Sequence, residues 1–366
     1  MRYTLRVKQL KKSVKMFRSV VPAVLLSYIK PRPVWAHLYV TRRCNLECNY
    51  CFVRDNRRAD SDETRMLQII DRLYLLGCRA IGFIGGEPTL HKGLHEMIRH
   101  ANDLGMVTHL STNGVKLTPA YLRRLGESQL DVINLSIDSL SECSQSGKDY
   151  VRSKRIFNDL IEARGRYGFE VTVNLVMTAK NIDSVVDTVR FIHNYDVPMS
   201  IGLIVSSYVN GTKGDESLYF TTAQQRKQLE DVATELAAMR RQRYNIIDPA
   251  AYFIEIGRFA RGERPKWKCM SGKHSMAVDC DGSYMVCGNL PVESLSIFDL
   301  EKHFYSRVAS LRTERFSQCT ATCLSNCMYD ISYFFYNPVS FFIKDLFRRR
   351  RTRRTAIIEP VGAVVT

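Results

Sequence analysis

The sequence predicts an α/β fold in which helices cover a parallel sheet. Short apolar runs rich in β-branched residues recur at 35–40, 80–84, 106–111, 132–137, 171–177 and 199–205, and helix-like stretches lie between them at 65–76, 94–104, 119–125, 154–167 and 182–194. Strands that are apolar on both faces are typical of parallel sheets buried under helices. The pattern leaves open whether the sheet is doubly wound or curls into a barrel. A chain of 366 residues can bury one large core and a smaller appended domain.

A group of three cysteines directly follows the first predicted strand. Cys44, Cys48 and Cys51 stand at a CxxxCxxC spacing in one short segment. Three thiolates are too few to close a four-ligand structural zinc site, so one coordination position stays open and an iron-sulfur cluster is expected. The alternative is a buried or disulfide-linked group, which the crowded spacing disfavours because a disulfide needs a specific separation.

A second motif, Gly85-Gly86-Glu87-Pro88, follows the second predicted strand. Two glycines let the backbone approach a ligand closely, and a carboxylate can neutralise a cation. A glycine pair by itself is an ordinary turn signal. Here it lies one strand-helix unit after the cysteines, which makes the combination specific.

Together the two motifs resemble the radical S-adenosylmethionine (SAM) superfamily. The resemblance implies that Cys44, Cys48 and Cys51 are catalytic ligands of a 4Fe-4S cluster whose open iron binds SAM. Tyr50 then lies near the adenine, and residues 85–88 bind the methionine ammonium. The resemblance also implies a partial (β/α)6 TIM-like barrel with the cluster at the carboxyl ends of the strands. An electron donor such as a flavodoxin or a ferredoxin is the implied partner.

Polar residues follow the third and fourth predicted strands. Ser111 and Asn113 lie at one strand end, and Ser136 and Asp138 at the next. In similar family members these positions contact the ribose and methionine portions of SAM. The alternative is a pair of ordinary turns, since Asn-Gly and Asp-Ser are common turn dipeptides.

A second group of cysteines lies towards the carboxyl end. It reads Cys269-x12-Gly282-x4-Cys287 and continues with Cys319, Cys323 and Cys327. This resembles the SPASM and twitch extensions of the same superfamily, which open with such a hairpin, and Asp281-Gly282 suits its turn. The resemblance implies a twitch-like domain with one auxiliary 4Fe-4S cluster, held by Cys269, Cys287 and members of the later trio. Cys280 is the weak member, because strand alternation points it away from the others. A zinc ribbon is the alternative.

Positive charge gathers at the two ends of the chain. Residues 1–33 carry nine Lys or Arg and no acid, and residues 344–366 carry seven against two acids, so most of the formal net charge of +16 lies there. Residues 3–21 place apolar side chains at steps of three and four, which predicts a basic amphipathic helix. With the aromatic and arginine-rich segment after Cys327, this predicts binding to an anionic membrane surface. The alternatives are a stripe that packs on the enzyme, RNA binding by the arginines, and a solvated tail.

The predicted organisation is therefore a basic amino-terminal segment (1–33), a radical SAM barrel (34–243), a linker (244–265), an auxiliary domain (266–330) and a tail (331–366). The predicted activity is reductive cleavage of SAM and hydrogen abstraction from an unactivated carbon. A lipid or lipid-linked substrate is preferred, at the cytoplasmic face of a membrane and with no nucleic acid partner. A peptide, sugar or nucleoside substrate is the alternative, and a metal-binding, RNA-interacting protein is the non-enzymatic one. No apolar run reaches the length of a membrane span.

Overall fold

The structure is a computed structural model that describes residues 15, 18–205, 215–288, 292–293, 295–300, 304–318 and 323–338. After a helix at 18–29, the elements are β1 (Trp35–Thr41), α2 (Glu63–Leu76), β2 (Ala80–Gly85), α3 (Leu94–Asp103), β3 (Val107–Thr112), α4 (Pro119–Glu127), β4 (Val132–Ser136), α5 (Tyr150–Tyr167), β5 (Glu170–Met177), α6 (Val185–His193), β6 (Met199–Leu203), α7 (Ala223–Arg241), α8 (Ala250–Ala260), β7 (Ser275–Val278), β8 (Tyr284–Met285), α9 (Phe304–Gln318) and α10 (Asn326–Tyr336). Single 3-10 turns lie at Pro88–Leu90, Ile182–Ser184, Glu216–Leu218 and Ile297–Asp299.

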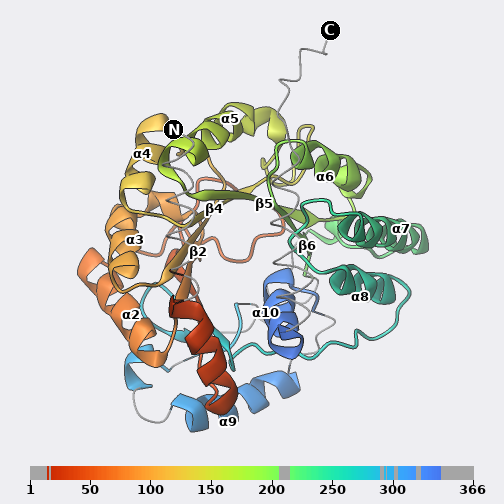
Figure 1. Cartoon of the computed structure of the whole chain (residues 1–366). Helices are drawn as coiled ribbons and strands as arrows, with labels where there is room; N and C mark the ends of the chain where they lie inside the picture. Colours follow the sequence, from red (N-terminus) through yellow and green to blue (C-terminus); the bar gives the residue numbers. More distant parts are fainter. Residues whose placement is uncertain are drawn as a thin grey trace.

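One curved sheet organises the chain, in the order β6-β5-β4-β3-β2-β1-β7-β8. Strands β1 to β6 are parallel to their neighbours, and helices α2 to α6 surround them on the outside (Figure 1). Successive strand-helix units add strands in one direction because each crossover has the same hand. The predicted α/β fold with a parallel, barrel-like sheet is confirmed.

The helices begin and end at residues with a clear local reason. Asp62 caps α2 by accepting a hydrogen bond from the backbone N–H of Arg65 at 2.7 Å. Gly77 ends the same helix with a φ of 114°, a left-handed conformation that favours glycine. At α7, Thr222 and Gln225 form a reciprocal capping box. These caps fix where each helix leaves and rejoins the sheet.

The two faces of the sheet differ in chemistry. The outer face packs against the helices through fully buried residues such as Leu38, Phe83 and Leu110. Alternate residues point to the opposite, inner face, which the strand pattern leaves half-buried. That face carries Trp35, His37, His109, Ser111, Asn134, Ser136, Thr172 and Asn174. The interior of the barrel is therefore lined largely by polar and aromatic side chains.

The carboxyl-terminal hairpin continues this sheet. Strand β7 pairs in parallel with β1, joining Trp35 to Ser275, and β8 pairs antiparallel with β7. Gly282 lies in the turn with a φ of 92°, in agreement with the predicted Asp281-Gly282 turn. The sequence analysis placed a domain boundary at residue 266. In the structure, strands from both sides of that boundary belong to one sheet, because β1 pairs with β2 on one side and with β7 on the other.

Helices α8 and α10 occupy segments that the sequence indicated as linker and tail. Helix α8 buries Tyr252 and Phe253 completely. Helix α10 crosses the predicted boundary at residue 330 and lies across the open side of the barrel, where Asn326 donates to Ser200 of β6 at 2.9 Å and Met328 contacts Ser275 of β7. Among the described residues, no helix is long and apolar enough to cross a membrane.

Candidate functional site

The three predicted cluster ligands lie in the loop after β1. Cys44 and Cys48 are half-buried, Cys51 is exposed, and all three are free thiols. The Cys44 N–H donates to Asn56 at 2.8 Å, and the Cys51 N–H donates to the carbonyl of Cys48 at 3.0 Å. Burial raises the pKa of the Cys48 thiol to about 11. A metal ion would have to displace that proton, as metal ions do at thiolate sites.

The donor chemistry of this loop fits an iron-sulfur cluster. Three free thiols stand in one segment at the carboxyl end of a barrel strand, with at least one open to solvent. In the part of the chain that the structure describes, no group of three or more His, Cys, Asp or Glu side chains is already arranged around a metal position. All three predicted ligands therefore lie in one loop.

The glycine motif is bonded directly to the cysteine loop. The N–H of Gly86 donates to the carbonyl of Thr41 at 2.8 Å, and the N–H of Glu87 donates to that of Arg43 at 2.8 Å. A Cβ on Gly86 would lie 2.1 Å from the Arg43 oxygen, and one on Gly85 would lie 2.3 Å from the Thr41 oxygen. The glycines thus admit the backbone that leads into Cys44, a role that the sequence analysis did not foresee.

The carboxylate of Glu87 is buried and hydrogen-bonded within the protein. It accepts hydrogen bonds from the Thr89 N–H at 3.1 Å and hydroxyl at 2.6 Å, from the Thr112 hydroxyl at 2.7 Å and from the Asn113 N–H at 2.8 Å. Only 1% of Glu87 is exposed. The side chain therefore joins the motif after β2 to the end of β3, and Pro88 begins the 3-10 turn that follows.

Two of the predicted strand-end residues reach the cysteine loop. The Asn113 side chain donates to Asn45 at 2.8 Å and lies 3.9 Å from the Cys44 sulfur. Asp138 accepts a hydrogen bond from the hydroxyl of Tyr50 at 2.6 Å. Ser111 and Ser136 instead lie on the inner face of the sheet, half-buried. The ends of β1, β2, β3 and β4 are thereby brought together around the loop.

A lysine that sequence reasoning missed completes this group. Lys148 donates to the hydroxyl of Tyr50 at 3.2 Å, and its ammonium lies 5.2 Å from the centre of the ring. Burial lowers the pKa of Lys148, but its electrostatic interactions with Tyr50, Cys48 and Asp138 outweigh the effect of burial and raise the pKa well above its usual value. Lys148 is thus a fixed positive charge beside the cysteine loop. The one local signal is Gly147, whose φ of 63° forms the turn that presents it.

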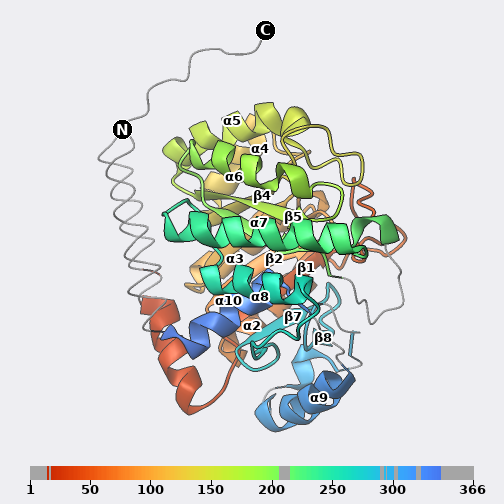
Figure 2. The same cartoon turned by 90° about the vertical axis from the view of Figure 1, so that its right-hand side faces the viewer.

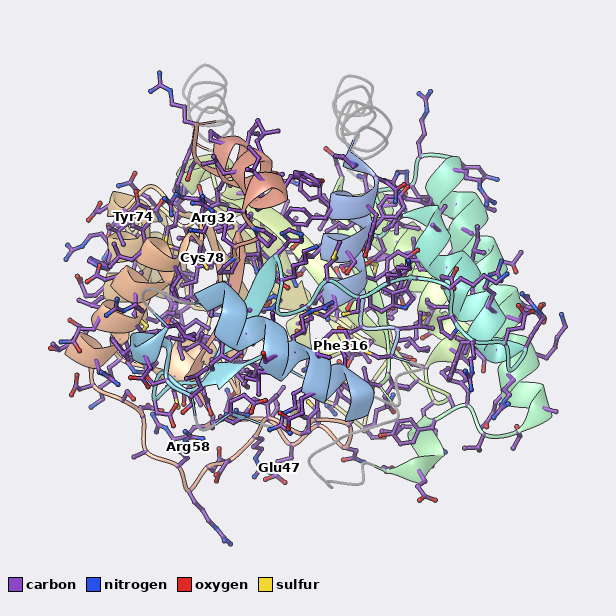
Figure 3. All side chains as sticks on the ribbon, turned by 90° about the horizontal axis from the view of Figure 1, so that it is seen from below. Arg32, Glu47, Arg58, Tyr74, Cys78 and Phe316 are labelled. Carbon is purple, nitrogen blue, oxygen red and sulfur yellow. The ribbon has the colours of Figure 1, made fainter. Side chains whose placement is uncertain are left out.

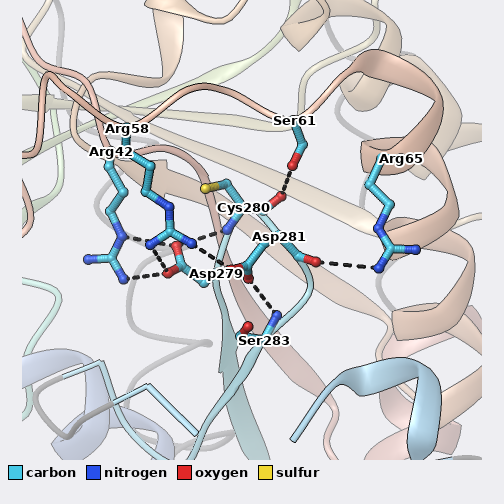
Figure 4. Close-up of polar contacts among 8 residues, drawn as sticks. All are labelled: Arg42, Arg58, Ser61, Arg65, Asp279, Cys280, Asp281 and Ser283. Carbon is cyan, nitrogen blue, oxygen red and sulfur yellow. Dashed lines mark hydrogen bonds and ion pairs between the residues drawn. The ribbon is translucent and has the colours of Figure 1, made fainter. Parts of the chain in front are cut away.

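Salt bridges connect the cysteine loop to the carboxyl-terminal hairpin (Figure 4). Arg42 binds both oxygens of Asp279 at 2.9 Å, and Arg58 adds a contact to the same carboxylate at 3.0 Å. Arg58 also binds Asp281 at 2.6 Å, and the Ser61 hydroxyl donates to the carbonyl of Cys280 at 2.6 Å. Asp279 is fully buried, and although burial alone raises its pKa, the hydrogen bond and charge of Arg42 bring the pKa below its usual value.

The second set of cysteines is divided between two places. Cys280 is buried in the hairpin turn, beside the charges of Asp279 and Arg58 (Figure 4). Cys287 and Cys327 both act electrostatically on Tyr39, an inner-face residue of β1, and Cys323 acts on Cys327. Cys269 is half-buried at the start of the hairpin, where its carbonyl accepts a hydrogen bond from Arg312 at 2.7 Å. Cys319 lies outside the described residues. That these thiols hold an auxiliary cluster stays a prediction.

A family model described as the radical SAM superfamily matches residues 38–192, which contain both motifs. Residues 38–192 thus form a radical SAM domain. Such a domain implies a SAM-binding 4Fe-4S cluster, in agreement with the three free thiols after β1.

Curated relatives match part of the chain. The S-adenosylmethionine-dependent nucleotide dehydratase of Flammeovirga pacifica is 33% identical over 152 residues, which is 38% of this chain and 52% of that protein. The PqqA peptide cyclase of Bradyrhizobium diazoefficiens is 27% identical over 252 residues, which is 66% of this chain and 62% of the relative. The chain thus spans less than two thirds of the length of these relatives.

Solved structures share the fold of this chain. Streptococcus suis SuiB bound to precursor peptide SuiA has a TM-score of 0.59 at 17% identity, over 82% of this chain and 72% of that one. Native anSMEcpe with bound AdoMet has a TM-score of 0.55 at 17% identity, over 87% of this chain and 100% of that one. At these identities the likeness concerns the fold alone.

Proposed function

We propose that the chain is a radical SAM enzyme that abstracts hydrogen from an unactivated carbon of a peptide. When bound, the cluster and SAM would supply a 5′-deoxyadenosyl radical, after one electron arrives from a donor such as a flavodoxin or ferredoxin. Cys44, Cys48 and Cys51 would hold the cluster, and Gly85 to Pro88 and Tyr50 would lie along SAM. In this proposal, the strand-end residues Ser111, Asn113, Ser136 and Asp138 orient the cofactor.

The polar inner face of the barrel is the observation that favours a peptide substrate. Ser111, Asn134 and Thr172 form one row across β3, β4 and β5, and Ser136 and Asn174 form the next. The Thr172 hydroxyl donates to the Asn134 side chain at 2.9 Å. The remaining hydrogen-bonding capacity of these hydroxyl and amide groups can serve peptide N–H and C=O groups, whereas a lipid chain would leave that capacity unused. His37 and His109 lie deeper on this face, and burial lowers the pKa of each to about 4. They are neutral at pH 7 and can donate and accept hydrogen bonds.

A lipid substrate, which the basic ends favoured, lacks support from the relatives. The PqqA peptide cyclase is a peptide enzyme by its description, and SuiB and anSMEcpe have been solved with peptides bound. These descriptions, added to the polar inner face, favour a peptide over a lipid.

The hairpin and the segment after it are proposed to hold an auxiliary 4Fe-4S cluster. Support comes from Cys287 and Cys327, which belong to distant segments and both lie near enough to Tyr39 to influence the pKa of its hydroxyl. Cys269, Cys323 and Cys319 would complete the ligand set. Anaerobic reconstitution should then give about eight iron atoms per chain, and about four for Cys287→Ala. About four iron atoms per chain in the unaltered protein, or zinc bound by these thiols, would contradict the proposal of an auxiliary cluster.

The experiment for the proposed reaction is deuterium transfer into 5′-deoxyadenosine. Cells are grown in deuterated medium, their extract is separated into peptide, nucleotide and lipid fractions, and each is incubated anaerobically with reduced protein and unlabelled SAM. Mass spectrometry should find deuterated 5′-deoxyadenosine with the peptide fraction. Cys44→Ala, Cys48→Ala and Cys51→Ala should each abolish SAM cleavage, and cleavage retained by any of them would contradict the assignment.

A nucleotide is the second candidate substrate. The observation that favours it is the 33% identity to a nucleotide dehydratase. That match covers only 38% of this chain, whereas the match to the peptide cyclase covers 66%. Deuterium transfer from the nucleotide fraction alone would replace the peptide proposal with this one.

A further inference from the structure

The helix at residues 18–29 carries an apolar face that the described protein leaves open. Ten large hydrophobic residues of the described chain are exposed, and four of them lie in this one helix. Leu25 is 61% exposed, Leu26 46%, Tyr28 46% and Ile29 83%. The five on α2, α5 and α8 and in two loops are scattered singly, which is ordinary for a protein surface.

The opposite face of the same helix is already buried. Ala23 and Val24 pack with Val34 and with Phe335 of α10. Tyr28 lies at the edge between the two faces, where its hydroxyl donates to the carbonyl of Phe335 at 2.8 Å. The exposed face is thus a second apolar surface, which continues onto α10 through Tyr336, 48% exposed. A helix that is apolar all round is normally covered on all sides.

The charge around this surface selects an anionic partner. Arg18 and Lys30 are exposed at the two ends of the helix. Residues 1–33 carry no acid, and the chain that follows α10 contains Arg348 to Arg351 in one run. An apolar helix face with aromatic side chains and basic flanks is the chemistry of a helix that lies in the interface of an anionic bilayer.

The surface lies at the end of the barrel opposite the cysteine loop. The helix leads into the amino end of β1 through Pro31 and Pro33, whereas Cys44 follows its carboxyl end, about 20 Å further along the strand. Figure 2 shows the helix beside α10 at one side of the molecule, and Figure 3 shows Arg32 at the opposite end from Glu47 and Arg58. The sequence analysis predicted membrane contact from a basic helix at 3–21 and from the segment after Cys327, and most of both lies outside the described residues, whereas the surface at residues 25–29 lies within them.

We propose that the exposed face of this helix, with Tyr336, docks the protein on an anionic membrane with the cysteine loop turned towards the aqueous side. The enzyme would then be held at a membrane and take its substrate from solution. The proposal is independent of the chemistry under Proposed function, because it concerns a surface remote from the site.

The first test is flotation of the full-length protein with vesicles. Binding is expected with vesicles that contain phosphatidylglycerol and should be weaker with phosphatidylcholine alone or at high salt. Leu25→Glu with Ile29→Glu should lower binding roughly 100-fold, because two inserted apolar side chains become charged. Leu75→Glu with Val151→Glu is the matched control, since these residues are 72% and 55% exposed elsewhere, and it should bind as the unaltered protein does.

Equal binding by the first double variant, or no binding by the unaltered protein, would overturn the proposal. The alternative occupant of such a surface is a second copy of the chain, and analytical ultracentrifugation tests for that self-association. An oligomer that the Leu25 and Ile29 substitutions dissociate, without a change in vesicle binding, would assign the surface to self-association and overturn the proposal as well.

The second test concerns orientation. Tryptophan is introduced at Ile29 or at Arg57, an exposed residue of the cysteine loop, and its fluorescence is measured with vesicles of brominated lipid. The Ile29→Trp variant should be quenched beyond the background of Trp35 and Trp267, and the Arg57→Trp variant should not. Quenching of the Arg57 variant would place the mouth of the barrel at the membrane and contradict the orientation.

Discussion

Substitution of Gly86 by alanine tests whether the glycine motif positions the cysteine loop. The new Cβ would lie 2.1 Å from the carbonyl oxygen of Arg43, 2.6 Å from its carbon and 2.7 Å from the oxygen of Arg42. These are backbone atoms, so no side chain can rotate away. To reach a tolerable contact near 3.0 Å, the segment has to retreat by about 0.9 Å. That segment leads directly into Cys44 and accepts the hydrogen bond from the N–H of Glu87.

A displacement of this size has two measurable consequences. Overpacking against rigid backbone costs about 1–3 kcal/mol of unfolding free energy. A 1 Å misplacement of reacting groups costs roughly 100-fold in rate, so 5′-deoxyadenosine formation by the reduced, reconstituted protein should fall by about that factor. Thermal unfolding and iron content are measured alongside, to separate a lost cluster from a misplaced one.

The matched control is Gly165→Ala within α5. No heavy atom lies within 4 Å of a Cβ at that position, and alanine in a helix is favoured over glycine by about 0.5–1 kcal/mol. The control should keep its activity and gain slightly in stability. If Gly86→Ala retained full activity and stability, the contact between the glycine motif and the cysteine loop would not be what places the thiols.

Three further predictions concern the groups around the site. Asp279→Asn should lower the free energy of unfolding by about 3 kcal/mol in denaturant titrations, because it leaves two arginines beside a buried neutral group. The control Asp281→Asn, at a carboxylate that is 47% exposed, should lower it by less than about 1 kcal/mol. Equal losses in the two variants would refute this prediction. Glu87→Gln should cost about 2 kcal/mol, since an amide cannot accept all four hydrogen bonds, and unchanged stability would contradict that role. Burial lowers the pKa of His37 and His109 to about 4, below the ordinary 6.5, so the unfolded chain takes up protons first as the pH falls. The stability present above pH 6.5 should therefore be lost as the pH falls towards 4. The thermal unfolding temperature of His109→Gln should depend less on pH than that of the unaltered protein.

The parallel barrel could be predicted because its signals are local. Each strand from β1 to β6 is a short apolar run bounded by a helix-like stretch, and its neighbour in sequence is its neighbour in the sheet. The convergence of Asn113 and Asp138 on the cysteine loop follows from the same rule, since parallel strands end at one edge.

The remaining features depend on contacts between distant residues, which no local pattern contains. The salt bridge between Arg42 and Asp279 joins positions far apart in the chain. The contact of Lys148 with Tyr50 depends on how the loop before α5 folds back. The sequence identifies Gly86 as a residue that permits close approach of another group. The structure shows that this group is the backbone of Arg42 and Arg43.

The pairing of β7 with β1 has a consequence for how the chain folds. Trp35 and Ser275 are adjacent in the sheet but are separated by most of the sequence, so this contact is among the slowest to form. During synthesis β1 can gain β2 early, while its other edge stays open until β7 has left the ribosome. The loop that carries Cys44 projects from the end of that half-paired strand and receives its Asp279 anchor only then. The order of synthesis therefore leaves an interval in which the cysteine loop is attached to the sheet on one side only, before Asp279 of the hairpin anchors Arg42.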